Sequence, residues 1–115
     1  MKNKTYTLRF RAVNRDIFEA IKSGDKKIET RAATVKYRDI KIDDTVVFVC
    51  GAKRFSRKIK QVKSFKGIDP MLRVFKIKDI MPGLKSKSEL ERAYYSYSGY
   101  KEKIKKFGLI AFKVN

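Results

Sequence analysis

The stretch SGDKKIETR, residues 23–31, places two kinds of cation and a carboxylate within a few positions of one another. Arg31 can present a bidentate fork to a phosphate or a base edge, and Lys26 a point charge to the same anion. Glu29 can accept from either cation, or from a base amino group as carboxylates do from cytosine. The competing interpretation is a capped helix followed by an exposed ion pair, worth about 0–1 kcal/mol. The residue types alone favour this second interpretation.

Several catalytic classes are excluded by composition. The chain has no histidine, which excludes a Ser-His-Asp triad, a Cys-His pair and any zinc site with histidine ligands. Its one cysteine, Cys50, lies inside the apolar run TVVFVCG, where a buried strand residue is expected rather than a nucleophile. We therefore expect no metal site and no cofactor.

The charge balance points to an anionic partner. The 115 residues include 30 Lys and Arg against 12 Asp and Glu, a formal net charge of +18. A field of that sign attracts polyanions, so RNA or a nucleotide is the first partner to expect, and a basic background or a solubility device is the alternative. Two runs carry much of the charge: Arg54, Arg57, Lys58, Lys60, Lys63 and Lys66, and then Lys101, Lys103, Lys105 and Lys106.

The sequence also indicates the localisation and the domain organisation to expect. MKNKTYTLRF at the N-terminus has no apolar leader, and no uncharged run approaches the ~20 residues that span a bilayer. We expect a cytoplasmic protein that does not enter a membrane. The length fits a single domain over residues 1–115, and we favour a monomer.

The pattern of residues predicts strands at both ends of the chain and helices between the last two. A helix is predicted to follow Asn14 as its N-cap and to end at Gly24, which suits left-handed backbone. The longest predicted strand should bulge or curl, because Ile59 and Val62 fall on different faces. The predicted strands are 5–10, 27–33, 45–50, 54–65 and 108–114.

Residues 70–106 are predicted to be helical. Asp69 is expected to cap a helix that has Pro70 at its first position. Ser86 or Ser88, with Glu89 or Glu91 three residues later, offers a capping box, and a last helix should stop at Gly108. Strands flanking a helical insert predict an α+β fold, a small mixed β-barrel flanked by helices.

The four spaced residues of the opening stretch resemble a family signature. Gly24, Lys26, Glu29 and Arg31 form the pattern G-x-K-x-x-E-x-R, which is similar to the motif of ASCH domains. Its place after the first helix agrees, as do the segments RDIKIDD, FSRKIKQVKSF and FGLIAF, so the resemblance covers residues 6–114. It implies a PUA-like fold with the motif in a cleft between barrel and helices. It also favours ligand binding over the interpretation as a capped helix and an exposed ion pair.

Two details qualify this resemblance. Asp43 stands where the family usually has glycine before Asp44, in a turn that Asp tolerates at some cost if φ is positive. Alternation along the strand puts Glu29 and Arg31 on one face, so the turn after Gly24 must rotate Lys26 inward. Gly24 itself would let a ligand or the strand approach the backbone closely.

The tyrosine-rich segment YYSYSGY, residues 94–100, is the second constellation. Aromatic rings among cations can stack unpaired bases, at about 1–3 kcal/mol per base. Half-buried tyrosines that anchor helices to the barrel explain the same pattern equally well. Tyr97 is the expected cleft residue, because helical spacing lets it share a face with Tyr94 or with Tyr100.

Three functions remain open from the sequence. The first is an RNA- or nucleotide-binding module with a cationic cleft between barrel and helices. The second is a hydrolase: a ribonuclease in which Lys26 stabilises a phosphorane and Glu29 acts as base, or an amidohydrolase acting on acetylcytidine. The latter is disfavoured because Glu29 holds the position of the threonine in those relatives, Thr30 points to the other face, and only Asp79 offers a distant carboxylate. The third is a protein-interaction adaptor whose charge is incidental.

Overall fold

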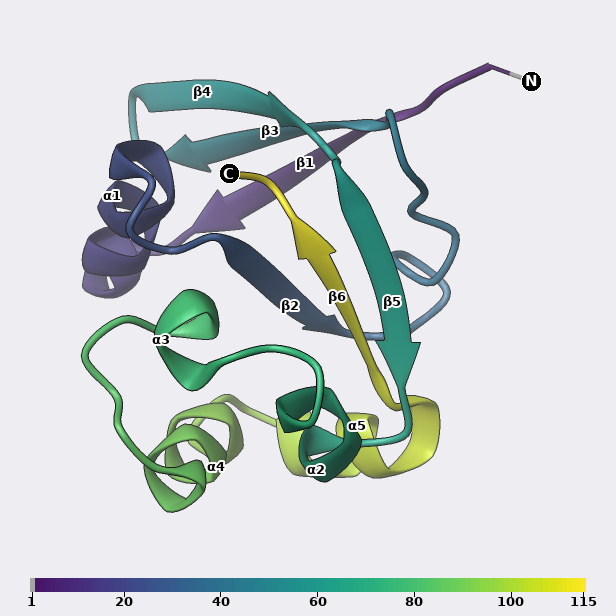
Figure 1. Cartoon of the computed structure of the whole chain (residues 1–115). Coiled ribbons are helices and arrows are strands. Elements are labelled where there is room, and N and C mark those ends of the chain that lie inside the picture. The colour runs from purple at the N-terminus through teal and green to yellow at the C-terminus, as the bar shows by residue number, and fades with distance from the viewer. Residues whose placement is uncertain (1) are drawn as a thin grey trace.

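The computed structural model describes residues 2–115 and confirms an α+β fold (Figure 1). Within these residues the strands form two three-stranded sheets, and their hydrogen-bonded ladders do not close into a barrel. Sheet A has the order β1-β3-β4, with β1 parallel to β3 and β4 antiparallel to it. Its strands are β1 (Thr5–Phe10), β3 (Thr45–Cys50) and β4 (Lys53–Lys58).

Sheet B is antiparallel throughout and has the order β2-β6-β5. Its strands are β2 (Ile28–Ala32), β5 (Gln61–Phe65) and β6 (Leu109–Lys113). The central strand β6 is covered on both faces, which explains its almost continuous apolar sequence LIAFK. The edge strand β2 carries Glu29 and Arg31 of the opening motif, and Gly24 and Lys26 precede it.

The chain passes from one sheet to the other between two consecutive residues. The amide of Ile59 donates to the carbonyl oxygen of Asp44, the residue just before β3 of sheet A. The amide of Lys60 instead donates to the carbonyl oxygen of Lys113, at the end of β6 in sheet B. The single strand predicted over 54–65 is therefore wrong, and β4 and β5 are separate strands. The predicted irregularity between Ile59 and Val62 is confirmed, and its cause is this change of partner.

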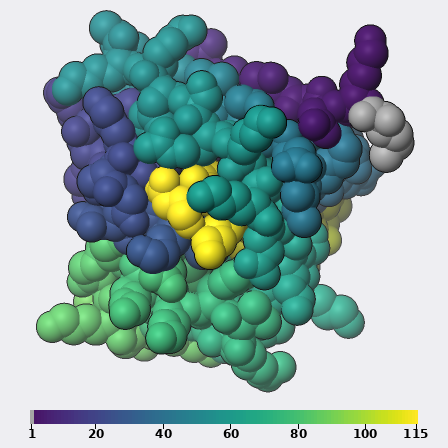
Figure 2. Space-filling model, turned by 45° about the horizontal axis from the view of Figure 1, so that its top comes forward, coloured from purple at the N-terminus to yellow at the C-terminus, as the bar shows by residue number. Residues whose placement is uncertain are grey.

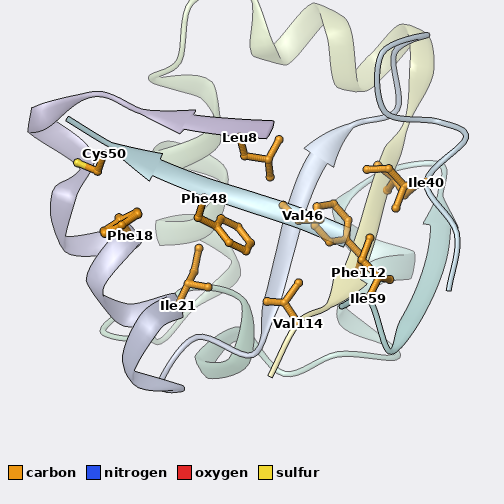
Figure 3. Close-up of a cluster of buried hydrophobic side chains, with 11 residues drawn as sticks. Leu8, Phe18, Ile21, Ile40, Val46, Phe48, Cys50, Ile59, Phe112 and Val114 are labelled. Atoms are coloured by element: carbon orange, nitrogen blue, oxygen red, sulfur yellow. The ribbon is translucent and has the colours of Figure 1, made fainter. Parts of the chain in front are cut away.

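One core cluster fills the space between the two sheets and α1 (Arg15–Ser23). Figure 3 shows side chains from β1, α1 and β3 gathered with Phe112 of β6 around Phe48. Phe48 stacks on Phe55 with ring centroids 5.0 Å apart, and Phe18 contacts the same Phe55 ring at 5.0 Å. This cluster holds α1, and with it the loop that leads into β2, against sheet A.

A second cluster lies on the other face of sheet B, under four short helices (Figure 1). Ile28, Leu109 and Ala111 of the sheet contact buried residues from each helix, such as Met71, Ile80, Leu90 and Ile104. The helices are α2 (Ile68–Leu72), α3 (Ile77–Ile80), α4 (Lys87–Tyr95) and α5 (Tyr100–Phe107). They cover the sheet face to which Ile28 points.

Most predicted helix ends are confirmed. Gly24 follows α1 in the left-handed conformation with φ +93°, Gly108 follows α5, and Ser86 accepts from the amide of Glu89 at 3.2 Å. The start predicted for the helix near Pro70 is wrong: α2 begins at Ile68, because this residue is buried in the second cluster and draws the helix two positions earlier.

The described part of the chain, residues 2–115, contains no helix that is long and apolar enough to cross a membrane. Figure 2 shows the C-terminal end of the chain (yellow) enclosed by α1, the β4–β5 region and the helical part. The side-chain amide Nδ2 of Asn115 there donates to the carbonyl oxygens of Ile21 at 2.6 Å and Lys26 at 3.0 Å. The last residue thus fixes the loop that presents Lys26.

Candidate functional site

Three residues of the opening motif form one buried ion network. Glu29 Oε2 accepts from Arg31 at 3.2 Å, and Glu29 Oε1 lies 3.5 Å from the ammonium of Lys26. Oε1 also accepts from the backbone amide of Thr30 at 3.0 Å. One carboxylate therefore contacts two cations. The alternative interpretation as an exposed surface ion pair is wrong, because Glu29 is buried.

Lys26 reaches the network through the turn that ends α1. Gly24 reverses the chain, the amide of Lys26 then donates to Ala20 at 2.9 Å, and the side chain turns toward Glu29. The inward rotation expected from the strand pattern is confirmed. The ammonium also donates to the carbonyl oxygen of Ile80 at the end of α3, and the residue is only 1% exposed. Lys26 thus joins the motif to the helical half of the molecule.

The electrostatics of the network are set by burial and by mutual attraction. Burial lowers the pKa of Lys26, and the nearby carboxylate of Glu29 opposes this shift. Burial alone would raise the pKa of Glu29, but Lys26, Arg31 and the amide of Thr30 together hold it below its usual value. Glu29 is therefore ionised near neutral pH, and its one negative charge is shared between the two cations.

Arg31 is held between aromatic rings as well as by Glu29. Its guanidinium lies 5.5 Å from the ring centroid of Phe10 and 5.7 Å from that of Tyr37. Cation–π contacts of this kind contribute about 0.5–1 kcal/mol at exposed sites and more when desolvated. The side chain keeps 22% of its surface exposed, so the guanidinium is fixed in orientation and still reachable.

The tyrosines of residues 94–100 have two different roles: two of them anchor helices to β2, and one lies at the cleft. The hydroxyl of Tyr94 lies 2.5 Å from the hydroxyl of Thr30, and that of Tyr100 accepts from the amide of Ala32 at 2.8 Å. These two side chains tie α4 and α5 to the edge of β2. Tyr97 is half-buried and meets the Tyr100 ring edge-on at 5.6 Å, and no residue among 2–115 accepts from its hydroxyl.

These groups border a cleft of about 250 Å³ between the end of β1, α1, β2 and the α4–α5 region. Lys26, Glu29, Arg31 and Tyr97 all line it, whereas Gly24 does not and acts by turning the chain. The lining contains four cations and one carboxylate and also includes apolar and aromatic side chains. The lining residues are Arg9, Phe10, Arg11, Asn14, Ile17, Lys26, Glu29, Thr30, Arg31, Met81, Tyr94, Tyr97 and Tyr100.

Sequence reasoning missed the arginines at the rim. Arg9 and Arg11 come from the end of β1, and both are exposed at the mouth of the cleft. The signal that could have found them is the sequence RFR at the end of a predicted strand, just before the helix that leads to the motif. Asn14 precedes α1 as predicted, but its side chain makes no capping bond and lines the cleft instead. The two long basic runs lie outside the lining.

Comparison with known proteins finds similar solved structures, and two of them cover almost the whole chain. The crystal structure of hypothetical protein PH0355 has a TM-score of 0.83 and 30% identity, covering 96% of this chain and 97% of that one. The solution NMR structure of protein PF0455 from Pyrococcus furiosus has a TM-score of 0.74 and 27% identity, with 96% of each chain covered. No protein-family model and no curated protein matches the chain. At this identity over almost its whole length, the chain belongs to the same family as hypothetical protein PH0355.

Proposed function

We propose that this protein is an ASCH-type module with a PUA-like fold that binds RNA, or a single nucleotide, in the cleft beside β2. The observation that carries the proposal is the convergence of Lys26, Glu29, Arg31 and Tyr97 on that cleft. The proposed PUA-like fold is supported by two sheets that pack on one core cluster and are joined by the β4–β5 crossing. The motif and the order of elements support the family assignment.

The cleft offers each kind of contact that a nucleotide requires. Arg9, Arg11 and Arg31 provide charge for a phosphate, and the fixed fork of Arg31 suits bidentate contact. The ring of Tyr97 provides a face for base stacking. A volume of about 250 Å³ is below the ~300–1,000 Å³ of drug-sized sites, so we expect one base inside and the phosphates at the arginine rim.

A hydrolase is the weaker candidate. A general base works best when its pKa lies near the working pH, whereas the pKa of Glu29 is lowered. Lys26 is only 1% exposed, and its ammonium is already occupied by the carbonyl oxygen of Ile80 and by Glu29, so it is poorly available to stabilise a phosphorane. Incubating labelled RNA with wild-type protein and Lys26→Ala tests this, and cleavage that depends on Lys26 would favour the enzyme.

The binding proposal is tested by fluorescence anisotropy with labelled single-stranded RNA and by calorimetry with mononucleotides. Arg31→Gln should weaken binding about 10- to 100-fold, because a charge-assisted hydrogen bond contributes about 1.5–3 kcal/mol. Tyr97→Leu should lose the stacking contribution of about 1–3 kcal/mol. Arg73→Gln is the control, since Arg73 is exposed and lies outside the cleft. Equal affinities for Arg31→Gln, Tyr97→Leu and the control would contradict the proposal.

A further inference from the structure

A second cationic groove lies at the edge of sheet B opposite the cleft. The sheet order β2-β6-β5 puts β2, with the cleft, at one edge and β5 at the other. There the end of β5 and the end of α5 form an open groove of about 450 Å³, lined by Phe65, Lys66, Lys105, Lys106 and Phe107 among others. We call it the β5–α5 groove. It shares no lining residue with the cleft.

A glycine brings these two chain segments together. Gly108 follows α5 with φ +77°, and a Cβ at this position would lie 2.3 Å from the carbonyl oxygen of Phe65. Only a residue without a side chain permits this approach of the two backbones. As a result Lys66, just after β5, lines the same groove as Lys105 and Lys106 in the last turn of α5.

The charge of this groove is uncompensated. Lys66, Lys105 and Lys106 line the groove, and Lys63 lies beside it on β5, with its ammonium 5.9 Å from the ring centroid of Phe65. All four lysines are exposed, and the four ion pairs found among residues 2–115 involve none of them. The sequence from 45 to 68 contains seven cations and no Asp or Glu. Figure 1 shows this segment running from β4 through β5 to the neighbourhood of α5, so the one-signed charge extends beyond the groove.

Structural roles explain part of this charge. Lysines on an edge strand oppose pairing with another molecule, and lysines in a last helical turn complement the helix dipole. Neither role explains an exposed aromatic ring in the same groove. Phe107 is 42% exposed, and the ammonium of Lys106 lies 5.3 Å from its ring centroid. The partial negative charge of about half a unit at the end of α5 is outweighed by four lysines.

Cations along an open groove together with an exposed aromatic face are the combination that binds single-stranded nucleic acid. We propose that the β5–α5 groove binds the backbone of a single-stranded polynucleotide. Lys63, Lys66, Lys105 and Lys106 contact phosphates, and Phe107 stacks on an unpaired base. The inference stands on this groove alone and holds whether or not the cleft binds a nucleotide.

The test measures the affinity of a fluorescein-labelled 20-nucleotide oligouridylate as a function of salt. The groove variant is Lys63→Gln/Lys66→Gln/Lys105→Gln, and the matched control, Lys22→Gln/Lys78→Gln/Lys85→Gln, removes three charges from exposed lysines elsewhere. Each phosphate contact to a single strand adds about 0.7 to the slope of log K against log salt. The groove variant should therefore lose about 2 units of slope and bind about 100-fold more weakly at 0.1 M salt.

The control should keep the wild-type slope to within about half a unit, and far-UV circular dichroism should show all variants folded. A second variant, Phe107→Ala, should bind about 5- to 100-fold more weakly with an unchanged slope, because it removes stacking and not charge. Equal losses for groove variant and control, or no binding of the oligonucleotide by wild-type protein, would overturn the inference. Mononucleotide binding reports the cleft separately, and the groove variant should leave it unchanged.

Discussion

Replacing Glu29 by glutamine tests whether one carboxylate holds the candidate site together. Glu29 is the counter-ion of Lys26 at 3.5 Å and of Arg31 at 3.2 Å. A glutamine has nearly the same shape, but it is neutral and places an amide donor among cationic donors. Lys26, which is 1% exposed, would then keep a buried charge without its partner.

The expected magnitude follows from the burial of the pair. Removing one partner of a buried ion pair costs about 3–5 kcal/mol, far more than the pair contributes against an apolar replacement. A chain of this length has an expected free energy of unfolding of roughly 6–17 kcal/mol, so Glu29→Gln should still fold. At about 4 °C per kcal/mol, its Tm should fall by about 12–20 °C.

Urea unfolding followed by circular dichroism gives the free energies directly. Glu19→Gln is the control, because Glu19 is exposed on α1 and should change stability by less than about 0.5 kcal/mol. The double variant Lys26→Met/Glu29→Gln removes both charges, so it should lose at least about 1 kcal/mol less than the sum of the single variants. A loss below about 1 kcal/mol for Glu29→Gln, or additive losses in the double variant, would refute the reasoning.

The dependence on pH gives an independent check. The folded pKa of Glu29 is lowered below its unfolded value of about 4.3, so the unfolded chain binds more protons between the two values. The stabilisation from Glu29 is therefore complete above that unfolded value and is lost as the pH falls through the folded pKa. The gap in stability between wild type and Glu29→Gln should narrow over the same acid range.

Three further predictions concern a turn residue, a glycine and a pair of tyrosines. Asp43→Gly should raise the free energy of unfolding by about 0.5–1 kcal/mol in urea, because Asp43 has φ +73°; a loss would show that its side chain stabilises the turn. Gly108→Ala should cost at least about 1–3 kcal/mol, because its Cβ would meet Phe65 O; unchanged stability would contradict the close approach. Burial raises the pKa of Tyr94 and of Tyr97, so stability should fall as the pH rises above about 10; a Tyr94→Phe/Tyr97→Phe variant that loses stability equally over this range would contradict the assignment.

Elements defined by local signals could be predicted from the sequence. The apolar run TVVFVC has the bounds predicted for it as β3, and the pair Ser86 and Glu89 caps α4 as a capping box should. Asp43 has a positive φ of +73°, a conformation that Asp tolerates better than most residues in such a turn. These features depend on residues within a few positions of one another, so a single sequence contains the information.

Features decided by distant partners could not be predicted. The break between β4 and β5 depends on Asp44 and Lys113, whose carbonyl oxygens accept from two consecutive amides. Asp44 directly precedes β3 of sheet A, whereas Lys113 ends β6 of sheet B. The start of α2 depends on the burial of Ile68 under other helices. Arg9 entered no site hypothesis, because the sequence does not show that the end of β1 lies beside β2.

The spacing of the motif predicts the site only in part, since it does not tell which side chains remain available. Lys26 and Glu29 contact each other and backbone groups, so their polar atoms are already paired. Arg31 and Tyr97 remain partly exposed. The sequence left two roles open for the tyrosines, anchoring of helices and stacking on a base. Tyr94 and Tyr100 anchor helices, and Tyr97 faces the cleft.

The position of the cleft at a sheet edge explains this division. An edge strand presents amides that another strand could pair with, and in β2 the amides of Thr30 and Ala32 bond instead to Glu29 and Tyr100. The groups that form the floor of the cleft are therefore the groups that complete the sheet. Substitutions in the floor must lower stability together with any affinity for a ligand. The rim is free of this constraint, because the side chains of Arg9 and Arg11 are exposed and make no hydrogen bond to the amides of β2. Rim variants can therefore separate binding from folding, as floor variants cannot.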